Sequence, residues 1–226
     1  MSEVKKQLFQ QLALVAHSLG SPQRIEMLDY LAQAERTVDE LSQLTQLSTA
    51  NTSRHLQVLK NNGLVKMQKQ GKNRLYRLAG EDVVLLIQQL RFVAENHLAE
   101  VNRLKQDLID YQSESSVLTA EETLSHLDDE DFILVDVRPT KEYAQGHIKG
   151  AMNIPPDRIE NAINTLPLDK TIVAYCRGPY CIYSHQMINT LRQQGVKALR
   201  LDEGFPEWKA AGLPYTSNTN KEGIKQ

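Results

Sequence analysis

Apolar residues recur at helical spacing in the first half of the chain and in short continuous runs in the second half. Apolar positions three or four apart predict amphipathic helices, and short runs bounded by turn residues predict strands. In the first half we expect helices over residues 4–19, 22–31, 38–46, 49–62 and 82–111, and a β-hairpin with strands 64–70 and 73–78. The last of these helices has a longer apolar face than a small domain needs internally, which favours pairing with a second copy of the chain.

The second half predicts strands that alternate with helices. Buried strands are expected at 132–137, 151–155, 170–175 and 197–201, with helices opening at Thr119 and spanning 140–148 and 182–191. This alternation indicates an α/β domain with a parallel sheet. The polar stretch 112–116 reads as a linker, so we expect a mainly α-helical domain at 1–112 and the α/β domain at 117–216.

Charge and composition narrow the class of protein. The 226 residues carry a formal net charge of −2, divided as +2 over residues 1–112 and −4 over 113–226. No run of about 18 apolar residues is present, and the start of the chain does not resemble a signal peptide, so we expect a cytoplasmic protein that does not enter a membrane.

Both cysteines of the chain lie in one loop, Cys176-Arg177-Gly178-Pro179-Tyr180-Cys181, between a predicted strand and a predicted helix. Backbone N–H groups and the helix dipole favour an anion there, and Arg177 adds positive charge, so the pKa of the Cys176 thiol is expected to be lowered. A structural disulfide, half of a zinc site and inert buried thiols are the alternatives. The setting at the end of a strand favours a reactive cysteine over each of them.

A basic segment follows the fourth predicted helix. From Arg54 to Arg77 there are seven cationic residues and no acidic one. Such runs are often only solvated surface, but a polar helix followed by a basic hairpin is typical of a DNA-binding element.

The stretches TSRHLQVLKNNGLV and GKNRLYRL, within a helix-turn-helix followed by a hairpin, resemble the winged helix of the arsenic-repressor (ArsR/SmtB) family over about residues 3–110. The resemblance implies a homodimer on double-stranded operator DNA. The cysteines through which many members bind metal are absent here, so we expect no metal site. Matching positions imply DNA contacts from the recognition helix and the wing: Thr49, Asn51, Thr52, Ser53, Arg54, His55, Lys72 and Arg74.

The stretch VDVRPTKEYAQGHIKGAMNIP, the loop CRGPYC and the segment from Gly204 to Pro214 resemble a single rhodanese (sulfurtransferase) domain over about residues 117–216. The resemblance implies that Cys176 accepts a sulfane sulfur from a donor such as thiosulfate or polysulfide, with no cofactor. Catalytic roles are expected for Cys176, Arg177 and, as a resolving thiol, Cys181. Substrate binding is expected at Gly178, Pro179 and Tyr180, and bracing of the sheet and loop at Asp136, Arg138, Glu142 and His147.

Phosphatases and arsenate reductases share this fold, but they clamp an oxyanion with an arginine six positions after the cysteine. Ile182 stands there, which favours sulfur transfer. We therefore expect a one-component transcriptional regulator that senses sulfane sulfur or thiol oxidants. The alternatives are a sulfurtransferase with an accessory DNA-binding domain, and a constitutive DNA-binding protein with a passive rhodanese fold.

Overall fold

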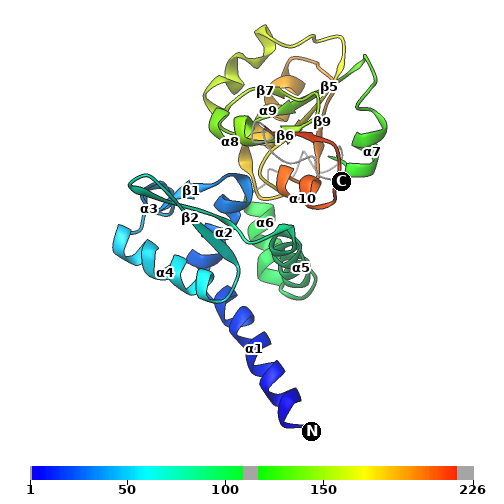
Figure 1. The fold of residues 1–226 in the computed structure, drawn as a ribbon. Helices are drawn as coiled ribbons and strands as arrows, with labels where there is room; N and C mark the ends of the chain where they lie inside the picture. Colours follow the sequence, from blue (N-terminus) through cyan, green and yellow to red (C-terminus); the bar gives the residue numbers. More distant parts are fainter. Residues whose placement is uncertain (1, 109–116, 218–226) are drawn as a thin grey trace, which may run out of the picture. The chain divides into compact units, whose positions relative to one another are not determined.

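The computed structural model describes residues 2–108 and 117–217, which form two compact units, residues 1–87 and 88–226. The boundary between the units falls inside helix α5 (Glu81–His97). The expected linker, 112–116, lies outside the described residues. Figure 1 labels the elements of both units.

The first unit is a helical domain with a small antiparallel sheet of order β1-β3-β2. Thr37 and Ser48 cap the third and fourth helices, each accepting a hydrogen bond from the backbone N–H three residues on. Its elements are α1 (Glu3–Leu19), α2 (Pro22–Gln33), β1 (Arg36–Thr37), α3 (Val38–Thr45), α4 (Thr49–Asn61), β2 (Val65–Gln70), β3 (Asn73–Leu78) and the start of α5.

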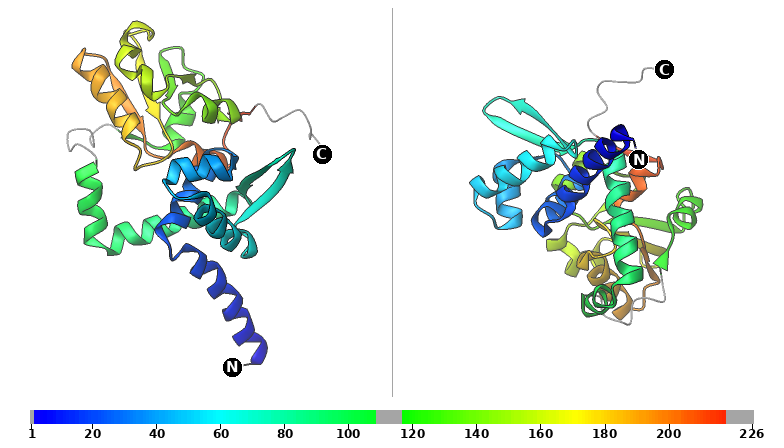
Figure 2. Two further views of the ribbon diagram at one scale, coloured as in Figure 1. Left: turned by 90° about the vertical axis from the view of Figure 1, so that its left-hand side faces the viewer. Right: turned by 90° about the horizontal axis from the view of Figure 1, so that it is seen from below.

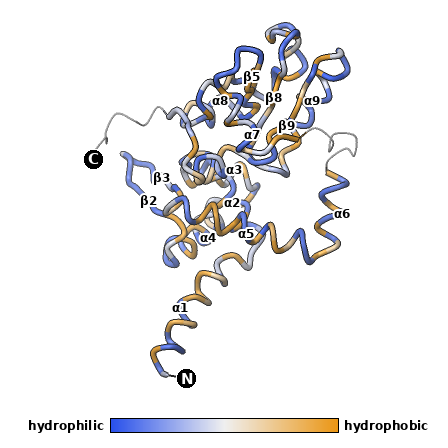
Figure 3. Tube along the Cα trace, turned by 90° about the vertical axis from the view of Figure 1, so that its right-hand side faces the viewer, coloured by the Kyte–Doolittle hydropathy of each residue, from blue (hydrophilic) through white to orange (hydrophobic). Residues whose placement is uncertain are grey.

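The core of the first unit lies among α2, α3, α4 and the sheet. Met27, Leu28, Leu41, Leu56 and Leu59 are all at most 1% exposed. These apolar positions are the ones that the helical spacing predicts, and Figure 3 shows hydrophilic residues along the projecting hairpin of β2 and β3. The winged helix-turn-helix class expected from the sequence is confirmed for this unit.

The predicted single helix over 82–111 is wrong in one respect. The chain forms α5 and then α6 (Ala99–Leu108), with a break at Leu98. The side-chain amide of Asn102 donates a 2.6 Å hydrogen bond to the carbonyl of Glu95, which in a continuous helix would accept from the N–H of residue 99. A local side-chain bond therefore accompanies the break.

The second unit contains a five-stranded parallel sheet of order β4-β9-β8-β5-β7. The α/β class is confirmed, although residues 147–148 form a short strand where the end of a helix was expected. Its other elements are β4 (Val117–Leu118), α7 (Ala120–Ser125), β5 (Phe132–Asp136), α8 (Thr140–Gln145), β6 (His147–Ile148), β7 (Met152–Asn153), η2 (Pro156–Asn164), β8 (Thr171–Tyr175), α9 (Ile182–Gln193), β9 (Ala198–Leu201), α10 (Phe205–Ala210) and β10 (Tyr215–Thr216).

Both faces of this sheet are covered. Ile172 and Ala174 of β8 face the cluster that contains η2 and α9, which lie side by side in Figure 2. Val173 and Tyr175 face the opposite cluster, which includes Trp208 of α10. Burial on both faces explains why the strand is a continuous apolar run rather than an alternating one. Cys176 follows this central strand directly, so the sheet fixes its position.

Candidate functional site

The recognition-helix candidates lie on α4. Thr49, Asn51, Ser53 and Arg54 are exposed, and His55 is half-buried. Burial, Arg24 and Arg54 all lower the pKa of the His55 imidazole, which disfavours the protonated form of this side chain. Polar and cationic side chains therefore share the exposed face of this helix.

Thr52 does not belong to that face. Its side chain is fully buried, and the expectation that it lies toward the outside is wrong. Thr52 precedes Leu56 by four residues and Leu59 by seven, so helical periodicity places all three on the core side. Within the described part of the chain its Oγ1 has no hydrogen-bond partner.

The two wing candidates, Lys72 and Arg74, are exposed around the turn of the hairpin. The turn is made at Gly71, whose φ of +61° favours glycine. Arg74 is paired in register with Lys69 across the two strands, so neighbouring cations gather at this end. This arrangement suits a polyanionic partner.

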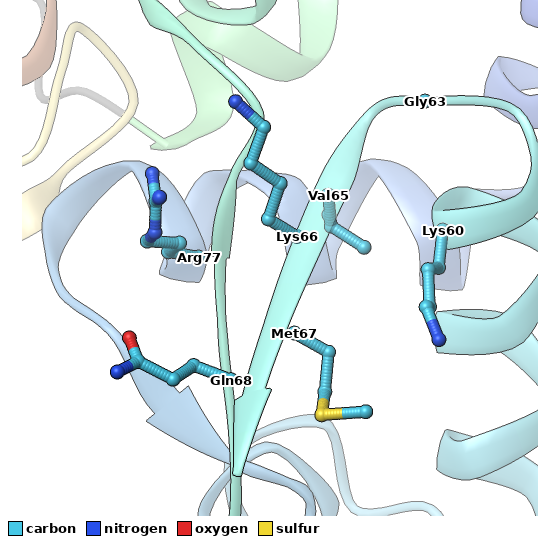
Figure 4. Close-up of a pocket in the computed structure, with 7 residues that line it drawn as sticks. All are labelled: Lys60, Gly63, Val65, Lys66, Met67, Gln68 and Arg77. Carbon is cyan, nitrogen blue, oxygen red and sulfur yellow. The ribbon is translucent and has the colours of Figure 1, made fainter.

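A groove of about 480 Å³ is lined by three cationic residues that are not among the predicted DNA contacts. It lies between the end of α4 and the outer strand β2, and Figure 4 shows Val65 and Met67 on the side facing α4, with Lys66 and Gln68 on the other. Lys60, Lys66 and Arg77 line it. All three belong to the basic segment from Arg54 to Arg77.

The cysteine loop crosses the carboxyl end of β8. Cys176 and Cys181 are joined by a disulfide bond, with their Cα atoms 6.2 Å apart, inside the usual range for a bridge. Cys176 is 3% exposed and Cys181 is half-buried. Cys181 is also the residue immediately before α9, so the N-terminus of that helix adjoins the loop, as predicted.

The Arg177 side chain pairs with a buried carboxylate. Its Nη2 and Nε donate to the two oxygens of Glu142 at 2.6 and 3.0 Å, a bidentate pair in which Glu142 is 1% exposed. Arg177 and Glu142 therefore neutralise one another, and this fork ties the loop to α8. The sequence placed the two residues in separate roles and did not predict this pair.

The bracing role expected for Asp136 and Arg138 is visible in the geometry. The two form an ion pair at 2.7 Å, and both side chains are fully buried. Burial opposes the charge on Arg138, but the charge and hydrogen bond of Asp136, together with Tyr175 and Glu142, outweigh it and raise the arginine pKa. The guanidinium also lies 4.3 Å from the ring centroid of Phe205, whose N–H donates to the carbonyl of Cys176.

At Gly204 another segment of the second unit approaches the backbone of the cysteine loop closely. A Cβ placed on it would overlap the carbonyl of Arg177 and lie 2.5 Å from the backbone nitrogen of Gly178. Only glycine allows this approach of two backbones. The sequence contained the signal, since Gly204 belongs to the third rhodanese-like motif.

The described residues hold no group of three or more His, Cys, Asp or Glu side chains suited to a metal ion. Within residues 2–108 and 117–217, no helix combines the length and apolar character that crossing a membrane requires.

Two family models match the chain in the order that the geometry suggests. The model of the bacterial regulatory protein, arsR family, matches residues 21–67, and the rhodanese-like domain model matches residues 119–211. A sulfurtransferase of Allochromatium vinosum is 39% identical over 91 residues, which are 40% of this chain and 83% of that protein.

A solved structure also resembles the first half. The homodimeric winged helix-turn-helix DNA-binding domain of Mb0332 from Mycobacterium bovis (fragment 1–100) is 38% identical, with a TM-score of 0.41, and covers 44% of this chain and 93% of that one.

One relative matches nearly the whole length. The HTH-type transcriptional regulator Rv0324 of Mycobacterium tuberculosis is 39% identical over 213 residues, which are 94% of this chain and 93% of that protein. Because the match runs through both halves, this chain belongs to the family of HTH-type transcriptional regulators in which an arsR-family DNA-binding region is followed by a rhodanese-like domain.

Proposed function

We propose that this regulator binds operator DNA as a homodimer and senses sulfane sulfur or thiol oxidants through Cys176. The observation that carries the proposal is the placement of Cys176 and Cys181 at the two ends of one loop, close enough to be bonded. Such a loop has a dithiol and a disulfide state, and a persulfide on Cys176 lies between them.

The chemistry proceeds in two balanced steps. The Cys176 thiolate attacks the outer sulfur of thiosulfate, the S–S bond of the donor breaks, and sulfite leaves with the bonding electron pair. The Cys176 persulfide is then attacked at its inner sulfur by the Cys181 thiolate, which forms the Cys176–Cys181 disulfide and releases hydrosulfide. Polysulfide donates in the same way, with a shortened polysulfide as the leaving group.

The surroundings of the loop favour sulfur over phosphate as the transferred group. Ile182 provides no guanidinium at the place where an oxyanion clamp would need one, and the Arg177 fork is engaged by Glu142. The loop amides and the N-terminus of α9 remain to stabilise a thiolate or persulfide anion. We assign Gly178, Pro179 and Tyr180 to the walls that receive the donor.

DNA binding is assigned to the exposed polar face of α4 and to the wing. Thr49, Asn51, Ser53, Arg54 and His55 are the candidates for the major groove, with Lys72 and Arg74 on the flanking phosphates. Thr52 is left out of this set because it is buried.

Exposed apolar side chains on three helices support the homodimer. Large apolar side chains that are 39–66% exposed are clustered on these helices, whereas exposed apolar residues on a monomer are usually scattered singly. A second copy of the chain would cover them. They are Val4, Leu8, Phe9, Leu12 and Leu14 on α1, Leu85, Leu90, Phe92 and Val93 on α5, and Leu104 and Leu108 on α6.

A sulfurtransferase whose product matters in itself is the second candidate, and the similarity to the Allochromatium vinosum sulfurtransferase favours it. The two functions differ in the fate of the sulfur. An enzyme passes sulfur to an acceptor through many turnovers, whereas a sensor holds one covalent state long enough to alter DNA binding.

The test is sulfur loading of the reduced full-length chain, followed by intact mass spectrometry. Thiosulfate or polysulfide should add one sulfur atom to Cys181→Ser and none to Cys176→Ala. Sulfur transfer from thiosulfate to cyanide should also be lost in Cys176→Ala. Sulfur loading of Cys176→Ala to the level of Cys181→Ser would contradict the assignment.

A further inference from the structure

The second half of α5 lies against the cysteine loop, within the second unit. The hydroxyl of Tyr180 donates a 2.6 Å hydrogen bond to Oε1 of Glu95, 85 positions earlier in the chain. The Arg91 guanidinium lies over the Tyr180 ring, 5.7 Å from its centroid. These contacts reach the residue immediately before Cys181, so they act on one end of the disulfide.

A second contact reaches the other wall of the same loop. Arg91 Nη2 pairs with Oε1 of Glu207 at 2.5 Å, and their side chains are only 16% and 9% exposed. The other carboxylate oxygen of Glu207 accepts from the N–H of Gly204, the residue packed on the loop backbone. Arg91 Nη1 would lie 3.4 Å from a Cβ on Gly178, so the helix approaches the loop closely.

We propose that Glu95 and Arg91 are positioning residues of the cysteine loop, which they hold in its disulfide-bonded conformation. The proposal rests on the reactivity assigned to Cys176 above, and it adds α5 as the element that responds to the covalent state of the loop. Because α5 begins in the core of the first unit, where Val83 and Val84 are buried, the helix that contacts the loop also belongs to the DNA-binding half.

Thermodynamic linkage gives this arrangement its consequence. The contacts are made to the loop with Cys176 and Cys181 joined. They favour disulfide formation over the dithiol by the amount by which they are weaker in the dithiol form. The proposal requires that reduction releases the Cys181 end of the loop and thereby weakens the contacts of Tyr180. The position of α5 and the covalent state of the loop are therefore coupled with equal strength in both directions.

The charge pattern is consistent with a stable contact at neutral pH. Burial, together with the hydrogen bond and charge of Glu95, raises the pKa of the Tyr180 hydroxyl, which therefore keeps the proton that it donates. The positive charge of Arg91 acts in the opposite direction and lowers the pKa of Tyr180. Glu95 also forms an ion pair with Lys105 of α6 at 3.4 Å. The carboxylate of Glu95 thus bonds to both the loop and α6.

The experiment measures the thiol–disulfide equilibrium of the full-length chain against dithiothreitol, without sulfur donor or DNA. Two electrons and two protons pass from the reagent to the two cysteines, and the reagent closes to its cyclic disulfide. Wild type is compared with Glu95→Ala, Tyr180→Phe and the double variant. Glu95→Gln, which retains an acceptor oxygen, tests rescue, and Glu100→Ala, an exposed carboxylate on α6, is the matched control.

We expect Glu95→Ala and Tyr180→Phe each to shift the equilibrium toward the dithiol by about fivefold or more. The double variant should shift no further than either single variant, because both remove one hydrogen bond. Glu95→Gln should restore part of the shift, and Glu100→Ala should show none.

Equilibria of Glu95→Ala and Tyr180→Phe equal to wild type, with unchanged circular dichroism, would overturn the inference. That outcome would leave sulfur loading of Cys176 intact. Conversely, a shift in these variants of a chain that takes up no sulfur would retain the inference and remove the proposed function.

Discussion

Tyr180 and Glu95 are joined by a hydrogen bond of 2.6 Å, although one lies beside the second cysteine and the other on the helix that leaves the winged-helix core. The two sequence motifs alone do not indicate how the cysteine loop could influence DNA binding, and this bond offers a physical route. A modification at the loop changes DNA affinity only through a contact that differs between two states. We propose this hydrogen bond as such a contact.

Replacement of Cys181 is expected to halt the reaction at the persulfide. Without the second thiol, the persulfide on Cys176 has no internal nucleophile, so Cys181→Ser should accumulate one added sulfur atom and release no hydrosulfide. Wild type should instead end as the disulfide with one hydrosulfide released per chain. Intact mass and sulfide assays measure both. Equal sulfide release from the two proteins would show that Cys181 is not the resolving thiol.

Gly204→Ala is expected to displace the cysteine loop. The added methyl group overlaps the Arg177 carbonyl, and a misplacement of about 1 Å at a reacting centre costs roughly a hundredfold in rate. Thiosulfate-to-cyanide transfer measures the loss. Gly20→Ala is the control, because a Cβ there meets its nearest atom, the His17 carbonyl oxygen, at an ordinary 3.5 Å. A wild-type rate in Gly204→Ala would contradict the tight approach.

Lys72→Ala and Arg74→Ala are each expected to weaken DNA binding uniformly across sequences. A lost phosphate contact should lower the slope of log affinity against log salt by about 1. Titrations at several salt concentrations measure it, with Lys197→Ala, an exposed lysine of the second unit, as the control. A slope unchanged in both wing variants would place the phosphate contacts elsewhere, and the groove residues Lys60 and Lys66 would be tested next.

Acid is expected to destabilise the protein through His185. Burial and the neighbouring Arg200 lower the pKa of this imidazole to about 4, against 6.5 for an ordinary histidine. The unfolded chain therefore binds more protons than the folded one between these values. The free energy of unfolding should fall as pH drops through this window, by up to about 3 kcal/mol.

Denaturant unfolding at pH 7 and pH 4.5 measures that effect, and His185→Gln should show a smaller loss than wild type. The exposed His126 provides the comparison, since His126→Gln should keep the wild-type dependence. Identical pH dependence in wild type and His185→Gln would assign the acid sensitivity to other groups.

Local patterns were sufficient to predict most of the fold. Capping residues such as Thr37 and Ser48, and the buried run before Cys176, act within a few positions, so the sequence exposes them. The burial of Thr52 was also within reach, because its spacing from Leu56 and Leu59 follows the helical repeat.

Contacts between distant segments could not be predicted in the same way. The pairs Arg177–Glu142 and Arg91–Glu207 join residues 35 and 116 positions apart. No local pattern marks Arg91 or Glu95, which read as ordinary surface residues of an amphipathic helix. Their role depends on which loop the fold brings against them.

Coupling between the cysteine loop and DNA binding is tested by the operator affinity of the full-length chain in three covalent states. The dithiol, the persulfide held in Cys181→Ser, and the Cys176–Cys181 disulfide are titrated with one operator duplex at one salt concentration. We expect at least one sulfur-modified form to differ from the dithiol in operator affinity by about 5- to 150-fold, and Glu95→Ala to reduce the difference. Equal affinities in all three states would contradict this coupling and leave the sulfurtransferase function in its place.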